Sequence, residues 1–149
     1  VIARRLLAIA SEDIGNADPR ALQITLNAWD VYERLGDKEG NRAIAHAAVF
    51  CACAPKSNAV HSAFNQAIQA AKDTSDLDVP VHLRNATTKL LEELGHGKGY
   101  RYAHNEPGGF SQGQTYFPEE MGEQIYYEPT DRGLEIKIKE KLKQLRAHL

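Results

Sequence analysis

The sequence predicts an all-α protein of five or six helices, with a long glycine- and tyrosine-rich loop before the last helix. Three observations favour this class. Apolar residues recur at three- and four-residue spacing through most of residues 2–94 and again through 131–148. Glycine and Asx-Pro signals, which end and begin helices, separate these stretches. Between 95 and 129, glycines and aromatic residues intermix and no helical period survives.

The first helix is expected from Ile2 to about Glu12, and Gly15 is the expected residue just beyond its end. Asp18 followed by proline is a helix-start signal, because an Asx side chain caps the first N–H groups and proline suits the first helical position. The second helix should therefore run from Pro19 to about Leu35. We expect one face of it to be buried, namely Ala21, Leu22, Thr25, Leu26, Trp29 and Tyr32.

A Pro-Lys-Ser-Asn corner at 55–58 separates two further amphipathic stretches. The third helix is expected from about Lys38 to Cys53, with Asp37 as its cap after Gly36, and the fourth from Ser57 to about Lys72. Such a short corner predicts that these two helices form an antiparallel pair. The expected inner stripes are Ala43, Ala47, Phe50 and Ala54 on the third helix, and Val60, Phe64, Ala67, Ile68 and Ala71 on the fourth.

Beyond the fourth helix, the composition of 73–81 predicts an acidic connecting segment. A short helix follows from Ala86 to Leu94, capped by Asn85 and stopped at Gly95. The loop at 95–129 is long for a compact domain, and such loops are often functional. Within it, 124–127 could form a short extended segment. The last helix is expected from about Asp131 to His148, with an inner stripe of Leu134, Ile138, Leu142, Leu145 and Leu149.

Size and composition narrow the function classes. A chain of 149 residues with a formal net charge of −2 suits one domain, 1–149, and carries no overall basic field for nucleic acid. No apolar run approaches the roughly 18 residues of a membrane-spanning helix, so no membrane association is expected. The first residue is Val1 and the only methionine is Met121, so we interpret the chain as a domain excised from a longer protein. Cys51 and Cys53 face opposite sides of a helix, which predicts small buried thiols and no disulfide or metal.

Candidate chemistry is sparse. The glycines at 95, 97 and 99 follow a helix and no Ser/Thr follows Lys98, so they do not form a phosphate-binding loop of the P-loop kind. No histidine pair or Cys/His cluster with metal-ligand spacing is present. Tyr100, Arg101, Tyr102 and His104 could form an acid–base group, but aromatic packing with polar tips outward is the favoured interpretation.

Two basic regions are candidates for phosphate contact. Residues 132–149 hold six Lys or Arg against two Glu, although a solvated helical face supported by a Glu135–Lys139 pair is the commoner meaning of such a pattern. Within this helix the candidate DNA-contacting residues are Lys137, Lys139, Lys141, Lys143 and Arg146. A second patch would combine the loop aromatics with Lys56, Arg84, Lys89, Lys98 and Arg101, as single-strand binding requires.

Three motifs taken together resemble a known family. They are IASEDIGNADP at 9–19, APKSNA at 54–59, and PVHLRNA at 80–86 continued by ELGHGKGYRYAH at 93–104 and YFP at 116–118. Their order and content resemble the C-terminal region of the RarA (MgsA) family of replication-associated recombination AAA+ ATPases, which are similar to clamp-loader subunits. The resemblance covers about residues 1–130. The motif positions without an assigned role are Lys56, Ser57, Asn58, Arg84, Asn85, Tyr100, Tyr102 and His104.

The resemblance implies a helical oligomerisation domain like the clamp-loader collar, forming a homotetramer. It implies that ATP and Mg²⁺ bind in an upstream module outside this chain, so that no catalytic, cofactor-binding or metal-binding residue is expected here. The parent protein would act in bacterial DNA replication, recombination and repair at stalled forks, in the cytoplasm with the nucleoid, with single-strand-binding protein as a partner. Two hypotheses follow: a non-catalytic assembly domain, or a DNA-contacting module that uses the basic terminal helix and the tyrosine-glycine loop. A weaker third hypothesis is a hydrolase-like site around 100–104.

Overall fold

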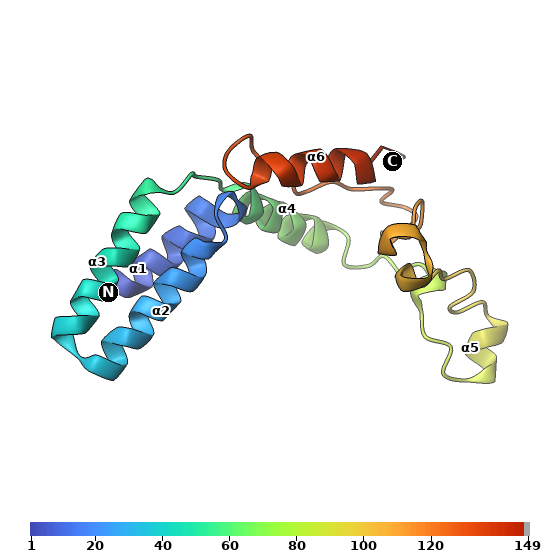
Figure 1. Ribbon diagram of the computed structural model, residues 1–149. Helices are drawn as coiled ribbons and strands as arrows, with labels where there is room; N and C mark the ends of the chain where they lie inside the picture. Colours follow the sequence, from blue (N-terminus) through green and yellow to red (C-terminus); the bar gives the residue numbers. More distant parts are fainter. Residues whose placement is uncertain (148–149) are drawn as a thin grey trace. The chain divides into compact units, whose positions relative to one another are not determined.

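The computed structural model describes residues 1–147. Six α-helices are joined by turns and single 3₁₀ or π turns, and no strand occurs in the described residues, so the prediction of an all-α fold is confirmed. The chain divides into two compact units (Figure 1). The first comprises 1–68 and 126–142; the second comprises 69–125 and the described residues from 143 onward. The expectation of one domain is not tested by this division, because contacts alone do not show which parts fold independently.

Helices α1 (Ile2–Ile9), α2 (Arg20–Leu35) and α3 (Asp37–Cys53) lie side by side in the first unit (Figure 1). The helical path continues beyond α1 through a π turn, Ala10–Ile14, before Gly15 reverses it with φ +50°. The first helical stretch thus extends to Ile14 and is longer than predicted. The π turn places the fully buried Ile14 in the core. Gly15 ends it as expected.

The core between these helices is built mainly from small residues. One buried cluster contains Ala10, Ile14, Ala21, Cys51 and Ala54. A second contains Leu6, Ala28 and Ala47. Small side chains allow the antiparallel helices α2 and α3 to approach closely along their length, and their contact is the most extensive between elements of the described chain.

The buried face of α2 differs from the predicted one. Ala21, Thr25 and Ala28 are buried, whereas Leu22 and Leu26 are each 47% exposed. Trp29 is only half-buried and Tyr32 is exposed, so the prediction was wrong for the large residues. Periodicity identified an apolar helix, but the small residues face the neighbouring helices and the larger ones face outward.

Helix α4 (Ala59–Asp73) shows the same reversal. Its buried residues are Ala59 and Ala63, while the predicted inner stripe is exposed at Val60 (40%), Phe64 (62%) and Ile68 (39%). The predicted antiparallel pairing of the third and fourth helices was also wrong, because α3 packs on α2 and makes no extended contact with α4 (Figure 1). The corner at 55–58 turns the chain away from α3 instead of folding it back.

Helix starts differ in two places from the capping predictions. The carboxylate of Asp37 does not cap α3; it accepts a hydrogen bond from the Tyr32 hydroxyl at 2.6 Å. In the second unit, α5 is the short helix Lys89–Glu93, and Thr88, not Asn85, accepts a hydrogen bond from the Leu91 N–H at 3.2 Å. Before α5, Val81–Leu83 forms a 3₁₀ turn. After it, 95–125 consists of turns and two further 3₁₀ turns, Ala103–Asn105 and Pro107–Gly109.

The last helix, α6, spans Glu135–Leu145. Turns occupy 131–134, so the helix begins four residues later than predicted. Of the expected inner stripe, Leu134 is 42% exposed and Ile138, Leu142 and Leu145 are half-buried. The predicted end at His148 and the stripe position Leu149 lie outside the described residues.

Gly133, in the turn before α6, provides a test of this fold. Its φ is +58°, and an added Cβ would overlap the carbonyl oxygen of Ala17 and stand 2.6 Å from Cγ of Pro55. Both obstacles are rigid, so Gly133→Ala should destabilise the chain by on the order of 3 kcal/mol in urea unfolding. Gly36→Ala is the matched control, because Gly36 has φ +83° with nothing within 4 Å of the added Cβ. It should cost only about 1 kcal/mol, and equal losses in both variants would contradict the close contact at Gly133.

Candidate functional site

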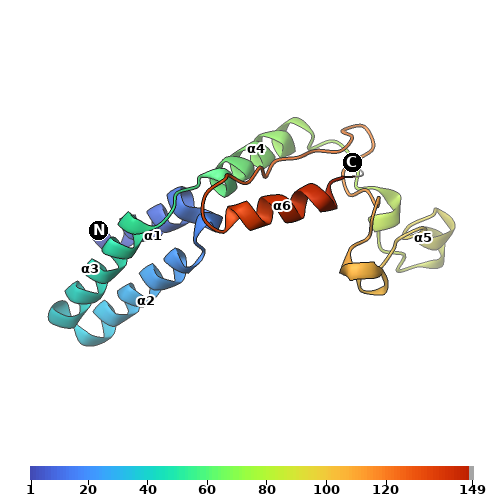
Figure 2. The same cartoon turned by 45° about the horizontal axis from the view of Figure 1, so that its top comes forward.

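Three segments distant in sequence meet in the first unit, between the helix ends (Figure 2). We name them the motif junction and define it as residues 13–18, 54–58 and 127–135. Main-chain groups join the segments: Ser57 N–H donates to Asp13 C=O at 2.7 Å, and Leu134 N–H donates to Ala17 C=O at 2.8 Å. The first two segments belong to the first two sequence motifs, so those motifs contact each other in the fold.

Glu135 lies at the centre of the motif junction and is fully buried. Its carboxylate accepts hydrogen bonds from the Tyr127 hydroxyl at 2.6 Å, from the Thr130 hydroxyl at 2.8 Å and from the Thr130 N–H at 3.2 Å. Ser57 adds a further side-chain hydrogen bond. Asn16 extends the network, because its Nδ2 donates to the Tyr127 oxygen at 3.4 Å.

These donors decide the charge of Glu135. Burial raises the pKa of a carboxyl group, whereas hydrogen bonds to the carboxylate lower it. At Glu135 the bonds from Ser57, Tyr127 and Thr130 together outweigh burial, and the pKa lies below its ordinary value. An ionised carboxylate therefore occupies the interior of the junction at neutral pH and is compensated by hydrogen-bond donors instead of a cation.

The corner residues at 56–58 have structural roles. The Lys56 ammonium donates to the carbonyl oxygens of Cys51 at 2.7 Å and of Ala54, at the C-terminal end of α3. A cation there satisfies carbonyls that have no intrahelical partner and suits the negative end of the helix dipole. Ser57 is 2% exposed, and its hydroxyl oxygen accepts from the Ala59 N–H at 3.1 Å, which caps α4. Asn58 is exposed.

The two cysteines have different environments. Cys51 is buried, and burial raises the pKa of its thiol despite the nearby Lys56. Cys53 is exposed, so the prediction that both thiols are buried was wrong for Cys53. Both are free, as the sequence spacing indicated.

The remaining motif residues lie in the second unit and are more exposed. Arg84 Nε donates to the Val79 carbonyl at 2.7 Å, and Asn85 is exposed. Tyr100 and Tyr102 are 51% and 55% exposed. The rings of Tyr102 and His104 lie with their centroids 5.0 Å apart and tilted by 46°.

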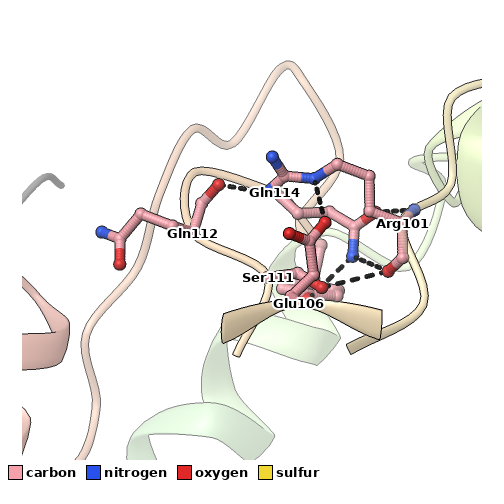
Figure 3. A network of polar contacts seen from close by, with 6 residues as sticks. Arg101, Glu106, Ser111, Gln112 and Gln114 are labelled. Carbon is pink, nitrogen blue, oxygen red and sulfur yellow. Dashed lines mark hydrogen bonds and ion pairs between the residues drawn. The ribbon is translucent and has the colours of Figure 1, made fainter. Parts of the chain in front are cut away.

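Arg101 fixes a loop within the second unit and does not bond to the neighbouring tyrosines or histidine (Figure 3). Its guanidinium donates to the Gln112 carbonyl and lies 3.5 Å from the Glu106 carboxylate. Its carbonyl accepts from the buried Ser111 hydroxyl at 3.0 Å and from the Gln114 amide at 3.2 Å. The proposed acid–base group at 100–104 is thus only partly assembled, because the arginine in its middle is engaged elsewhere.

The second basic patch is partly formed. Lys98 and Arg101 line a hollow of about 330 Å³ together with His82, whereas Arg84 and Lys98 line an adjoining hollow of about 690 Å³. Lys56 belongs to the first unit and lines neither hollow. Lys89 begins α5 and lines neither hollow.

The basic residues of α6 do not share one face. Lys137 and Lys141 are four residues apart and lie on one side, while Lys139 and Lys143 lie on another. Arg146 is in the turn after the helix. Lys139 pairs with Asp131 at 2.9 Å, so the predicted Glu135–Lys139 pair was wrong and the buried Glu135 has other partners.

Sequence reasoning missed the central role of Glu135, Tyr127 and Thr130. A glutamate in the first turn of a helix is ordinary, and no sequence signal marked it as buried.

No three metal-binding side chains gather anywhere in 1–147. Within the same range, no helix has the length and apolar character needed to span a bilayer.

Comparison with known proteins gives consistent matches over almost the whole chain. Residues 1–146 match the family described as MgsA AAA+ ATPase C terminal. The chain is 61% identical over 145 residues to replication-associated recombination protein A of Haemophilus influenzae, which covers 97% of this chain and 32% of that protein. It is 60% identical over 141 residues to the protein of the same name in Escherichia coli, covering 95% of this chain and 32% of the relative.

A more distant relative with the same name, from Bacillus subtilis, is 40% identical over 144 residues, covering 97% of this chain and 33% of that protein. The chain therefore spans about a third of the length of the curated relatives that it matches.

The buried carboxylate predicts a specific pH dependence. Because the folded-state pKa of Glu135 is lowered, its contribution to stability is present above the unfolded pKa of about 4.3 and is lost as pH falls through the folded value. Glu135→Gln should destabilise the chain by on the order of 1–3 kcal/mol at pH 7, since the new amide group faces donors. The difference in free energy of unfolding between the variant and wild type, measured in urea, should become steadily smaller below about pH 4.3.

Glu140→Gln on α6 is the control, because Glu140 is exposed and makes none of these hydrogen bonds. A Glu135→Gln variant as stable as wild type at pH 7 would contradict the role of the carboxylate in the motif junction.

Proposed function

The chain belongs to the MgsA AAA+ ATPase C-terminal family, and from this premise we propose that it is a non-catalytic assembly domain that holds AAA+ subunits together as a homotetramer. Proteins of this kind named in the comparison are replication-associated recombination proteins. A role of the parent protein in DNA replication and recombination therefore accompanies the proposal. The observation that supports the assembly proposal is the exposed apolar face of α4.

The exposure of this face is unusual, because the large apolar side chains of a helix normally pack in the core. Val60, Phe64 and Ile68 follow one another at four-residue spacing in the first unit, and all three remain exposed. The small residues Ala59 and Ala63 supply the buried side of the same helix. A helix that turns its alanines inward and its larger apolar residues outward leaves a surface suited to a second protein chain.

The second copy of this chain is the proposed occupant. Helix α2 carries a further outward pair of the same kind, Leu22 and Leu26, at four-residue spacing. Two apolar helical faces on one unit allow each copy to contact two neighbours, and such contacts can close a ring of identical subunits. Burying one side chain of this size contributes about 1.5–3 kcal/mol, so a few of them can hold an assembly together.

The parts of the proposal that concern the whole protein follow from the family. ATP and Mg²⁺ would bind in a module upstream of the matched third, and DNA and single-strand-binding protein would be partners of the parent protein in replication, recombination and repair. We place that protein in the bacterial cytoplasm, associated with the nucleoid.

A second proposed function is direct contact with DNA. The half-exposed tyrosines of the second unit favour it, because exposed aromatic rings in a glycine-rich loop are suited to stacking on bases. The lysines of α6 could add phosphate contacts, although their division between two helix faces limits how many can reach one strand.

Phe64→Glu tests the assembly function. The charge would be buried at the proposed interface without a partner, which costs several kcal/mol per contact. The wild-type chain should sediment as a tetramer at micromolar concentration and the variant as a monomer, with an unchanged helical circular dichroism spectrum.

Gln66→Glu introduces the same charge at an exposed position of α4 that does not belong to the apolar face, and it should leave the tetramer intact. A wild-type chain that is monomeric at micromolar concentration would contradict the proposal. So would a Phe64→Glu variant that keeps the wild-type mass.

A further inference from the structure

We propose that the second unit contains a groove for single-stranded nucleic acid, in which His82, Lys98 and Arg101 hold the phosphates and nearby tyrosines stack on the bases. The inference deepens the proposed contact with DNA and rests on it, while it is independent of assembly. It assigns this contact to one site, the 330 Å³ hollow between residues 98–101 and 113–115.

The composition of the lining of this hollow favours anions. Seven residues form it, and the side chains that can carry charge are Lys98, Arg101 and His82, without any carboxylate. Lys98 is exposed and its ammonium makes no ion pair with any residue of 1–147. Arg101 is held on one side by Glu106, which is not part of the lining. The hollow thus has an unpaired cation where a phosphate oxygen could bind.

The walls of the groove are fixed by hydrogen bonds before any ligand arrives. His82 Nε2 donates to the Thr115 carbonyl at 2.6 Å, which joins the 3₁₀ turn at 81–83 to one wall. The Arg101 N–H donates to Gln114 Oε1 at 2.7 Å, and Gln114 returns a bond to the Arg101 carbonyl at 3.2 Å (Figure 3). A site held in place in this way loses little conformational entropy on binding.

The glycine at 99 makes room for a backbone in the groove. Gly99 lines the hollow, has φ +85°, and has nothing within 4 Å of an added Cβ. The N–H of Gly99 donates no hydrogen bond to the described residues. A main-chain N–H beside a lysine is a recurring partner of phosphate oxygens.

Tyrosines are the sequence neighbours of lining residues on both walls of the groove. Tyr100 and Tyr102 adjoin Arg101 and are 51% and 55% exposed, and Tyr116 adjoins Thr115 and is 53% exposed. The Tyr116 hydroxyl accepts from Gln114 Nε2 at 3.0 Å, which orients that ring against the same wall. Cations that track a backbone together with exposed aromatic rings are the combination found in single-strand sites. Bases inside a duplex are already stacked, so the rings favour a single strand.

The neighbouring hollow sets the limit of the site. It shares His82, Lys98 and Thr115 with the groove but is also lined by Glu119, Glu120 and Glu123. Carboxylates repel a polyanion, so the strand should pass by residues 98–101 and avoid the acidic end.

The test measures binding of a fluorescent oligothymidylate to the 149-residue chain by anisotropy in about 20 mM salt. The two permanent cations of the groove, Lys98 and Arg101, predict a slope of about −1.4 in log affinity against log salt concentration. Lys98→Gln should reduce that slope by about 0.7. Tyr100→Ala should weaken binding by about fivefold or more, and an oligomer of the same length without bases should bind wild type and Tyr100→Ala equally.

Lys89→Gln is the matched control, because it removes the same charge from the second unit outside the groove. It should leave affinity and slope close to wild type. Equal effects of Lys89→Gln and Lys98→Gln would overturn the site, and so would polyglutamate that competes as well as the oligonucleotide. Binding that is lost in Lys137→Gln/Lys141→Gln and kept in Lys98→Gln would assign DNA contact to α6 instead.

Absence of binding at low salt would remove both the groove and the broader DNA-contact proposal. The assembly function has a separate readout in the mass of the chain, so its failure and the failure of the groove are distinguished by sedimentation.

Discussion

The arrangement of the first unit depends on the buried carboxylate of Glu135. Three segments far apart in the sequence each direct a donor toward it or toward the tyrosine that binds it. A buried charge is costly unless hydrogen bonds satisfy it, so each segment is held by the need to keep its donor in place. The ends of α1, α3 and α6 therefore meet at one point although the core between the helices consists largely of alanine, which by itself specifies position weakly.

The corner between α3 and α4 is part of the same constraint. Lys56 neutralises the carbonyl end of α3, and Ser57 both caps α4 and contacts Glu135. Two adjacent residues thus end one helix, begin the next and attach both to a distant segment. The residue types of the corner at 55–58 are thus accounted for by these structural contacts.

Helix existence could be predicted from the sequence, because periodicity and glycine stops depend on local spacing. The element that packs on each helical face could not be predicted, because spacing shows that a face is apolar but does not show what covers it. Val60, Phe64 and Leu26 were placed inside for this reason, whereas the structure leaves them outside. Of the site, Lys56 and Ser57 were recognisable as motif positions. Glu135, which binds Ser57, was not recognisable, because one of the segments around it is far away in sequence. The Arg132–Lys56 hydrogen bond between the same two segments has a separation of 76.

The different environments of the two thiols give the chain a natural chemical handle. Cys53 is exposed at the last residue of α3, and Cys51 is buried with a raised pKa, which keeps it protonated and slow to react. A maleimide dye should therefore attach to a single position without any engineered substitution. That position lies one corner away from the apolar face of α4, so energy transfer between labelled copies could follow subunit exchange in real time.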